Sequence, residues 1–343
     1  YAQSASSDTP TAGNIIKRKI YYSEEGFADP DTGTWVEFTP APADDATFAT
    51  VKAALLENLK ARTGGTVPIS LKQTWEEVAE ASDLLDTYTG AAAGYSLRRL
   101  KTGATNAIRV RRSSNNDEQD IGFVDGELDT VSLLAFVGTA VTDNGYVKIF
   151  YDQSGNSNDA TQTVTGSQPQ IVSSGAVIVE NGKPAAEFDG SNDHLKMLFS
   201  SDLPQPTHHF AVAKSDVTGA IKILFSGNND TSKRHQYEIN SGGKWTFYAG
   251  ASITATASAT INQTLHSVLA NGASSDFYQD ATELASGDAG SFPLDGLTLG
   301  ARAITNAFTW EGNIQEYILF DSNQSEAAQT GIETNINTFY NIY

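Results

Sequence analysis

The sequence predicts a mainly β protein, a β-sandwich or jelly roll preceded by a small α+β unit. Beyond Gly90, short β-prone runs recur, and turn clusters such as DQSGNSND, NGKP and SGNND separate them. Many short strands with Gly/Asn/Asp turns are typical of sandwiches. Hydrophobic residues make up 39% of the chain, which is enough for a packed core. The expected strands are Ala107–Arg112, Tyr146–Tyr151, Ala185–Phe188, His209–Ala213, Ile221–Phe225, Gln236–Ile239, Lys244–Tyr248, His266–Ala270, Leu297–Leu299 and Ile314–Phe320.

The first part of the chain is expected to form an arm and a small docking domain. Residues 1–13 carry no periodicity and predict a flexible arm. IIKRKIYY (15–22) and TWVEF (34–38) flank a Pro/Gly turn, a pattern that predicts a hairpin. We therefore place a small α+β domain at 14–86 and the sandwich at 87–343.

Two helices are expected in this small domain. Asp44-Asp45 opens the first helix and Gly64-Gly65 closes it. Residues 66–71 predict a short edge strand, because Pro68 cannot donate to a central ladder. The capping-box sequence TWEE (74–77) predicts a second helix that carries Val78, Ala81, Leu84 and Leu85.

Two further helices are expected within the sandwich domain. Asp129 caps the segment VSLLAFV, and Gly138 ends it. The last helix, residues 325–340, predicts one apolar face that packs on the sandwich. That face consists of Ile332, Ile336, Phe339 and Tyr340.

Charge and composition exclude several functions. Against 41 Asp+Glu stand 22 Lys+Arg, so the net charge is −19, which disfavours nucleic acid and anionic membranes as partners. The absence of cysteine excludes disulfides, thiolate nucleophiles and Cys-type zinc sites. No apolar run is long enough to cross a bilayer as a helix.

Three strings carry a family resemblance. They are RVRRSS (109–114), YDQSGN (151–156) and ETNINTFYNIY (333–343). Over roughly residues 84–343 the chain resembles a lectin-like module of the concanavalin/laminin-G superfamily, as found in phage tail and other virion surface proteins. The resemblance implies a concanavalin-like jelly-roll sandwich with a closing C-terminal helix.

The same strings are similar, more weakly, to the catalytic domain of type-B α-L-arabinofuranosidases. That resemblance implies a retaining mechanism with two carboxylates. It makes Glu238 the candidate nucleophile, with a slippage of one residue in HQYE (235–238). The loop in which the family has its acid/base is ARAITN (301–306) here, and it contains no carboxylate. We therefore expect a protein that is not an enzyme, with a degenerate glycosidase-like site as the alternative. The remaining candidates for a second carboxylate are Asp276, Asp280, Glu283, Asp295 and Glu311.

Six cations between Arg98 and Arg112, with no acid among them, form the strongest charge feature. Arg109 and Arg111 share one face of a strand and are candidates for binding an acidic glycan, such as a uronate or a sulfated sugar. The alternative is that these arginines pair with the chain's own acids just downstream, Asp117, Glu118 and Asp120.

Two further groups of residues are candidates for ligand binding: aromatic residues for a sugar, and oxygen-bearing residues for calcium. Trp245, Tyr248 and Trp310 are candidates for a platform under a sugar ring, although most aromatic residues are expected in the core. Asp152, Asn156 and Asp159 belong to a segment rich in oxygen-bearing side chains around a glycine. Such side chains could bind Ca²⁺, but they are equally typical of Asx turns. No metal other than calcium and no other cofactor is expected.

Together these observations predict a virion surface protein, such as a phage tail-fibre, baseplate or head-decoration subunit. Residues 1–86 would contact other virion subunits, the sandwich would attach to a host-surface glycan, and the protein would be a homo-oligomer outside the cell. The alternatives are a glycoside hydrolase of arabinofuranosidase type and a purely structural module without a ligand. Fold-level analogy alone does not choose among them.

Overall fold

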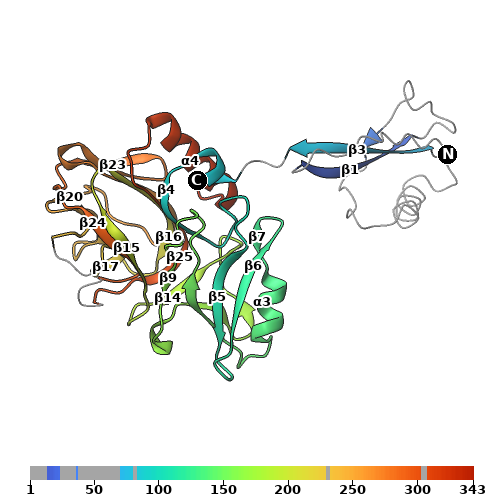
Figure 1. Ribbon diagram of the computed structural model, residues 1–343, viewed down its shortest axis with the longest axis horizontal. Helices are drawn as coiled ribbons and strands as arrows, with labels where there is room; N and C mark the ends of the chain where they lie inside the picture. Colours follow the sequence, from blue (N-terminus) through green and yellow to red (C-terminus); the bar gives the residue numbers. More distant parts are fainter. Residues whose placement is uncertain (1–13, 24–35, 38–69, 80–82, 229–231, 303–306) are drawn as a thin grey trace. The chain divides into compact units, whose positions relative to one another are not determined.

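The computed structural model describes residues 14–23, 36–37, 70–79, 83–228, 232–302 and 307–343, with side chains from Asp83 onward (Figure 1). The chain divides into two compact units, residues 1–81 and 82–343. The predicted arm at 1–13 and the helix predicted to open at Asp44-Asp45 lie outside the described residues. No helix among the described residues is long and apolar enough to cross a membrane.

The described part of the first unit is a three-stranded antiparallel sheet in the order β2-β1-β3. Its strands are β1 (Asn14–Ser23), β2 (Val36–Glu37) and β3 (Ser70–Ala79). The pairing of β1 with β2 confirms the predicted hairpin partners.

The prediction of a helix that begins at the TWEE sequence (74–77) is wrong. Residues 70–79 form strand β3, which pairs with β1 without interruption from Asn14↔Ala79 to Ser23↔Ser70. This continuous pairing with a partner strand overrides the helical pattern of the segment, because local propensity is a weak prior against tertiary context. Leu84 and Leu85 instead belong to the short helix α2 (Leu84–Thr87).

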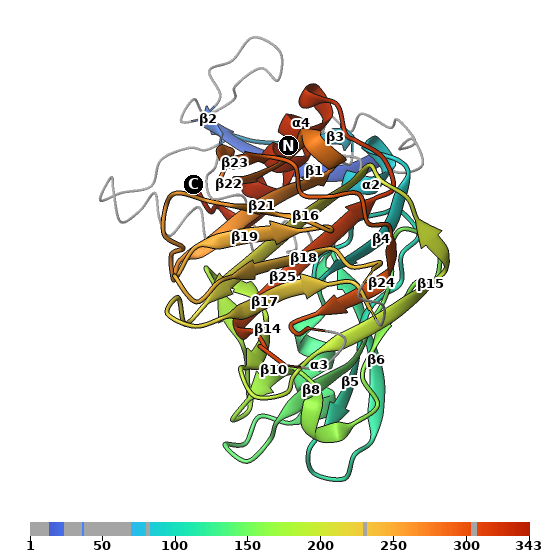
Figure 2. The same ribbon diagram turned by 90° about the vertical axis from the view of Figure 1, so that its left-hand side faces the viewer.

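The second unit is a β-sandwich, as the sequence predicts (Figure 2). Its first layer follows the pairing β6-β5-β8-β10-β14-β25-β16-β21-β22-β23, and β4 shares one edge of β25 with β14. These strands are β4 (Ala91–Ser96), β5 (Asn106–Arg112), β6 (Glu118–Val124), β8 (Gly145–Phe150), β10 (Gln170–Ser173), β14 (Ala186–Asp189), β16 (Thr207–Ser215), β21 (Gln263–Ala270), β22 (Ser275–Gln279), β23 (Thr282–Gly287) and β25 (Glu311–Phe320).

The second layer follows the pairing β9-β15-β24-β17-β18-β19-β20, and β9 also pairs with β8 of the first layer. Its strands are β9 (Ala160–Thr161), β15 (Leu195–Leu203), β17 (Lys222–Ser226), β18 (Gln236–Ile239), β19 (Trp245–Tyr248), β20 (Ser252–Thr254) and β24 (Leu294–Leu299). Three short strand pairs complete the unit: β7 (Glu127–Leu128) on β6, β11 (Ala176–Val177) on β10, and β12 (Val179–Glu180) with β13 (Lys183–Pro184). Each of the ten strands predicted from the sequence overlaps a strand of the structure.

The main core lies between the two layers and is rich in aromatic rings. Phe225 of the second layer meets Tyr317 of the first at 5.3 Å between ring centroids, and Tyr237 meets Phe277 at 5.4 Å. All four residues are fully buried. Such ring pairs add to the apolar burial that holds two sheets together.

A second core lies on the other face of the first layer, where α4 (Glu326–Tyr340) covers it. Ile332 and Ile336 of α4 pack with Phe210 of β16 and Ile318 of β25. Ser325 caps the helix by accepting from the Ala328 N–H, and Asn341 ends it in the left-handed conformation. The predicted C-terminal helix and its apolar face are thus confirmed.

The helix predicted after Asp129 is also confirmed, as α3 (Thr130–Val137). The Asp129 carboxylate accepts from the Ser132 N–H, and Gly138 follows the helix with φ = 107°. Leu133 and Val137 of α3 are buried in the main core.

A buried ion pair ties α4 to the first layer. The Arg98 guanidinium donates to Glu316 Oε2 at 2.7 Å and to Oε1 at 3.0 Å, and it also donates to Asn335 of α4 at 2.8 Å. Both charged side chains are almost completely excluded from solvent. Buried charges need such pairing, because desolvation of a lone charge is costly.

Replacing Glu316 by Ala is therefore expected to destabilise the protein by about 3–5 kcal/mol, since it leaves the Arg98 charge buried without its partner. Urea unfolding of the variant measures the loss. The double change Arg98→Met with Glu316→Leu is expected to lose less than the single change. A single-change loss below about 1 kcal/mol, the level of an exposed pair, would contradict this account.

Candidate functional site

The candidate site lies on the outer face of the second layer, where β18 presents Gln236 and Glu238. Successive side chains of a strand point to opposite faces, so Tyr237 and Ile239 point the other way. Tyr237 is fully buried and stacks on Trp245 at 4.7 Å between ring centroids. The burial of Tyr237 thus fixes the outward direction of Glu238.

A row of polar side chains crosses this outer face. Gln236 lies opposite Ser226 of β17 and Tyr248 of β19. Ser226 in turn lies opposite Thr298 of β24, and Thr298 lies opposite Lys196 of β15. Cross-strand partners share a face, so these side chains form one continuous polar row next to Glu238, in which Ser226 and Thr298 are fully buried (Figure 2 shows the strand order).

Two arginines complete the surroundings of Glu238. Arg234 lies four residues before it, on the same face by strand alternation, and its guanidinium stacks on the Tyr248 ring at 4.8 Å. Arg302 follows the turn that begins at Gly300, whose N–H donates to Leu224 O at 2.9 Å. Gly300 has φ = 80°, and a Cβ there would collide with the Phe188 ring at 2.3 Å, so this turn requires glycine.

The electrostatics of Glu238 are set by burial and by these cations. Glu238 is half-buried and accepts a hydrogen bond from the Gln236 side-chain amide. Burial raises the pKa of Glu238 above its ordinary value, and the Gln236 hydrogen bond and the positive charges of Arg302 and Arg234 offset only part of this rise. The two guanidiniums therefore limit the rise in the pKa of this carboxylate.

The five other carboxylates considered as partners of Glu238 lie elsewhere. Asp276, Asp280 and Glu283 belong to the end of the first layer at β22 and β23. Glu311 forms an ion pair with Lys222 at 2.8 Å. Asp295 accepts from the Asn228 N–H at 2.8 Å, and alternation along β24 places it on the face opposite to Thr298. In the described part of the chain, the charged groups that act on Glu238 are both cations.

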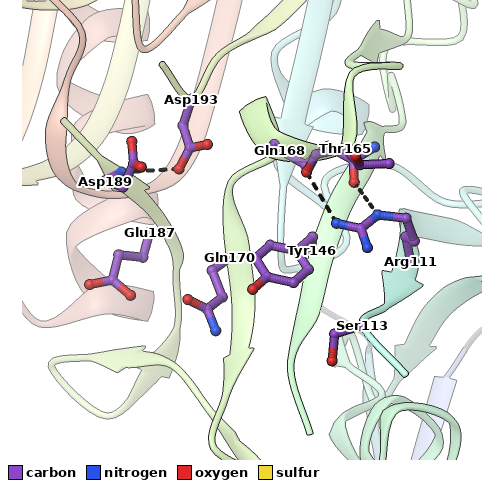
Figure 3. A pocket seen from close by; sticks show the side chains of 10 residues that line it. Arg111, Ser113, Tyr146, Thr165, Gln168, Gln170, Glu187, Asp189 and Asp193 are labelled. Atoms are coloured by element: carbon purple, nitrogen blue, oxygen red, sulfur yellow. Dashed lines mark hydrogen bonds between the residues drawn. The ribbon is translucent and has the colours of Figure 1, made fainter. Parts of the chain in front are cut away.

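A separate open cavity of ≈ 540 Å³ lies along the first layer (Figure 3). Arg111, Tyr146, Gln170 and Glu187 line it from four neighbouring strands, β5, β8, β10 and β14. Figure 3 shows Arg111 on one side and the carboxylates of Glu187 and Asp193 on the other. Burial, followed by the like charges of Asp189 and Glu187, raises the pKa of Asp193 to about 7.

Arg109 and Arg111, the predicted glycan ligands, are engaged with the protein itself. Arg109 donates two hydrogen bonds to Asp120, at 2.6 and 2.9 Å, as the alternative interpretation of the basic segment expects. Arg111 is buried, donates to Gln168 at 2.7 Å and to Asn116 at 2.9 Å, and stacks on Tyr146 at 4.7 Å. Arg111 therefore shapes the wall of the cavity.

Two of the three predicted aromatic platforms need correction. Trp245 is 2% exposed and Trp310 is fully buried, and their rings lie 6.0 Å apart in the main core. They fill space between the sheets, so neither can offer a surface to a sugar. Tyr248 is half-buried on the outer face beside Arg234 and keeps its place among the candidates.

The predicted calcium residues form a closed turn. The Asp152 carboxylate accepts from the backbone N–H groups of Gly94, Ser154 and Asn158, at 2.9–3.0 Å. Asp159 accepts from the Asp152 N–H at 2.9 Å, and the Asn156 amide donates to Ala91 O. Within the residues that the structure describes, no group of three or more His, Asp or Glu side chains could hold a metal ion.

Three residues near Glu238 were not predicted from the sequence: Arg234, Gln236 and Arg302. A signal for the first two was present, since Arg234, Gln236 and Glu238 alternate with His235 and Tyr237. A polar residue at every second position is the pattern of a strand with one polar face. Arg302 follows a strand that lies two strands away in the sheet, so only the fold brings it close.

Comparisons with known proteins identify the fold. The chain resembles a mutant GH54 α-L-arabinofuranosidase soaked with 4-nitrophenyl α-L-arabinofuranoside, with 13% identity and a TM-score of 0.60. It also resembles an arabinofuranosidase complexed with arabinofuranosyl-α-1,2-xylobiose, with 15% identity and a TM-score of 0.58. Each match covers 74% of this chain and 64% of the other. No family model and no curated protein matches the sequence.

These matches correct the expectation that the chain is not an enzyme. The solved structures that share its sandwich are glycoside hydrolases, one of them soaked with a cyclic sulfate inhibitor. None of these three is a phage or virion protein. The shared feature is the fold, and the argument for a reaction has to come from the site.

The raised pKa of Asp193 makes stability depend on pH. A carboxyl whose pKa rises on folding binds protons more tightly in the native state, so its effect on stability grows less favourable as pH rises from about 4 to about 7. We expect Asp193→Asn, which does not titrate, to gain on the order of 1 kcal/mol relative to the wild type between pH 4 and pH 8.

Thermal unfolding of both proteins across this pH range measures that gain. Asp321→Asn, at an exposed position, is the matched control for the loss of one carboxylate. A constant difference between Asp193→Asn and the wild type at all pH values would contradict the assignment.

Proposed function

We propose that this chain is a glycoside hydrolase of arabinofuranosidase type, with its site on the outer face of β18 and Glu238 as the nucleophile. The observation that carries the proposal is a half-buried carboxylate that points outward and feels the charges of two guanidiniums, on a sandwich that resembles those of arabinofuranosidases. The sequence resemblance in RVRRSS and YDQSGN supports the same family.

The proposed step is attack of a Glu238 carboxylate oxygen on the anomeric carbon of the sugar. The new ester bond forms as the bond from the anomeric carbon to the leaving oxygen breaks, and that oxygen keeps the bonding electrons and takes a proton from water. A second water then attacks the anomeric carbon, which breaks the ester, releases the sugar and restores the Glu238 carboxylate. The attacking group has to be ionised, a state that Arg302 and Arg234 stabilise. At one end of the polar row, the half-buried Tyr248 would offer its hydroxyl to the sugar.

Glycan recognition is the part of the virion-surface prediction that this proposal retains. Binding of a glycan on the outer face precedes its hydrolysis, and the half-buried Tyr248 is suited to contact a sugar ring. Attachment to a host surface, assembly through residues 1–86 and an extracellular location stay predictions from the sequence.

Hydrolysis of 4-nitrophenyl α-L-arabinofuranoside tests the proposal. Nitrophenolate is a good leaving group and departs without a proton, so this substrate reports on the nucleophile alone. We expect release of nitrophenolate by the wild type and a loss of roughly a thousandfold or more in Glu238→Gln, because the amide cannot form the ester.

The matched control is Glu127→Gln, which removes a surface carboxylate paired with Lys183 and is expected to leave the rate unchanged. Equal rates for the wild type and Glu238→Gln would overturn the proposal. So would the absence of any turnover by folded wild-type protein.

A further inference from the structure

Polar atoms without a hydrogen-bond partner gather around Glu238. Among the described residues, eleven buried side-chain nitrogen or oxygen atoms lack a partner, and seven of them lie on or beside β17, β18 and β24. The seven are Ser226 Oγ, Asn228 Oδ1, Arg234 Nε, Arg234 Nη1, Gln236 Oε1, Thr298 Oγ1 and Arg302 Nε. Buried polar groups are usually paired, so such a concentration needs a cause. A ligand that satisfies these atoms provides one.

The arginines are the most telling members of this group. Arg234 is only 8% exposed, yet its Nε and Nη1 have no acceptor among the described residues. Its closest ring contact, Tyr248, offers a π-face at 4.8 Å but no carboxylate. A buried guanidinium with open donors is costly unless an anion or a set of oxygen acceptors completes it.

The charge count around the site leads to the same conclusion. Arg234 lies close enough to Arg302 for the two charges to lower the pKa of Arg234, after the larger effect of burial. Glu238 is the carboxylate that acts on both groups from the same face. Among the described residues, two guanidiniums against one carboxylate leave an excess positive charge, in a chain whose net charge is −19. At physiological salt this local charge dominates, because distant surface acids are screened beyond about 8 Å.

We infer that the site is specific for an acidic saccharide, in which a uronate carboxylate next to the cleaved sugar is bound by Arg234 and Arg302. Arginine suits this role because it stays charged when desolvated and presents several N–H donors to a carboxylate. The hydroxyls and amides of Ser226, Gln236 and Thr298 would accept from or donate to the neighbouring sugar hydroxyls. This inference rests on the proposed function and defines its substrate class.

The sequence analysis attributed acidic-glycan binding to other arginines. In the basic segment Arg109 is paired with Asp120, and Arg111 donates to Gln168, Asn116 and Thr165. Arg234 and Arg302 retain open donors. The candidate residues for binding an acidic glycan therefore lie on the outer face of the second layer and not on the first layer.

The test compares two arabinofuranosyl-substituted oligosaccharides that differ only in whether the sugar next to the substituted unit carries a uronate carboxylate. For the wild type we expect kcat/KM at least tenfold higher on the uronate substrate, and we expect the difference to shrink as NaCl rises. Arg234→Gln is expected to lower kcat/KM on both substrates, because Arg234 also acts on Glu238, and to bring the ratio of the two kcat/KM values close to one. Arg234→Lys, which keeps the charge, is expected to restore part of the preference.

Arg112→Gln is the matched control, since Arg112 pairs with Asp117 on the surface, and it is expected to keep the preference. Equal hydrolysis of the two substrates by the wild type would overturn the inference and leave the proposed function intact. Hydrolysis of neither would overturn the proposed function.

In that last case, calorimetric titration of the wild type with the uronate oligosaccharide decides the inference on its own. Salt-sensitive binding that Arg234→Gln abolishes supports an acidic-saccharide site, and no binding, or equal binding by Arg234→Gln, overturns it. If Arg234→Gln fails to fold, the salt dependence of wild-type binding to the two oligosaccharides replaces the variant. If salt weakens binding of the uronate oligosaccharide alone, the result supports the inference. If salt weakens binding of both oligosaccharides equally, the result overturns it.

Discussion

The packing of Tyr237 between the two sheets is the constraint on which the site depends. Its ring is stacked on Trp245 and meets Phe225 at 5.6 Å and Phe277 at 5.4 Å, so it cannot leave the core without opening a large cavity. Because side chains alternate along a strand, this one buried ring sends Gln236 and Glu238 outward. A slip of one residue in β18 would exchange the polar and aromatic faces, and the aromatic core would resist it.

The same alternation explains how a short polar segment becomes a site. Four neighbouring strands, β15, β24, β17 and β18, each turn an apolar residue toward the core and a polar one outward. The outward residues come from parts of the chain that are about ten to a hundred residues apart in sequence. The turn at Gly300 then brings Arg302 to the same face, and the electrostatic character of the site comes from these separate contributions.

Features encoded by neighbouring residues could be predicted from the sequence. A β-prone run between turns predicts β18, a capping residue predicts α3 and an apolar face predicts α4, because these signals depend on local geometry. The segment 70–79 shows the opposite case: its capping box predicts a helix, but pairing with β1 makes it a strand. The strand β15 was also missed, since its segment KMLFSSDL mixes apolar and polar residues without clear alternation.

The candidate site was predictable only in part. Glu238 came from the resemblance, whereas Arg302 and Thr298 reach it through strand order, which a single sequence does not contain. The burial of Trp245 and Trp310 could not be predicted either, because the sequence of a strand does not show which of its two faces packs against the core. The charge pattern led to Arg109 and Arg111, but charge runs do not reveal which arginines already have partners.

The central claim is that Glu238 is the carboxylate that becomes bonded to the sugar. Mass spectrometry after incubation with an activated 2-fluoro arabinofuranoside tests it most directly, because such reagents trap the ester on the attacking carboxylate. The account predicts one added sugar on the peptide that contains Glu238. An adduct on another carboxylate, such as Glu187 or Asp193 in the cavity of the first layer, would contradict it, as would a protein that remains unlabelled.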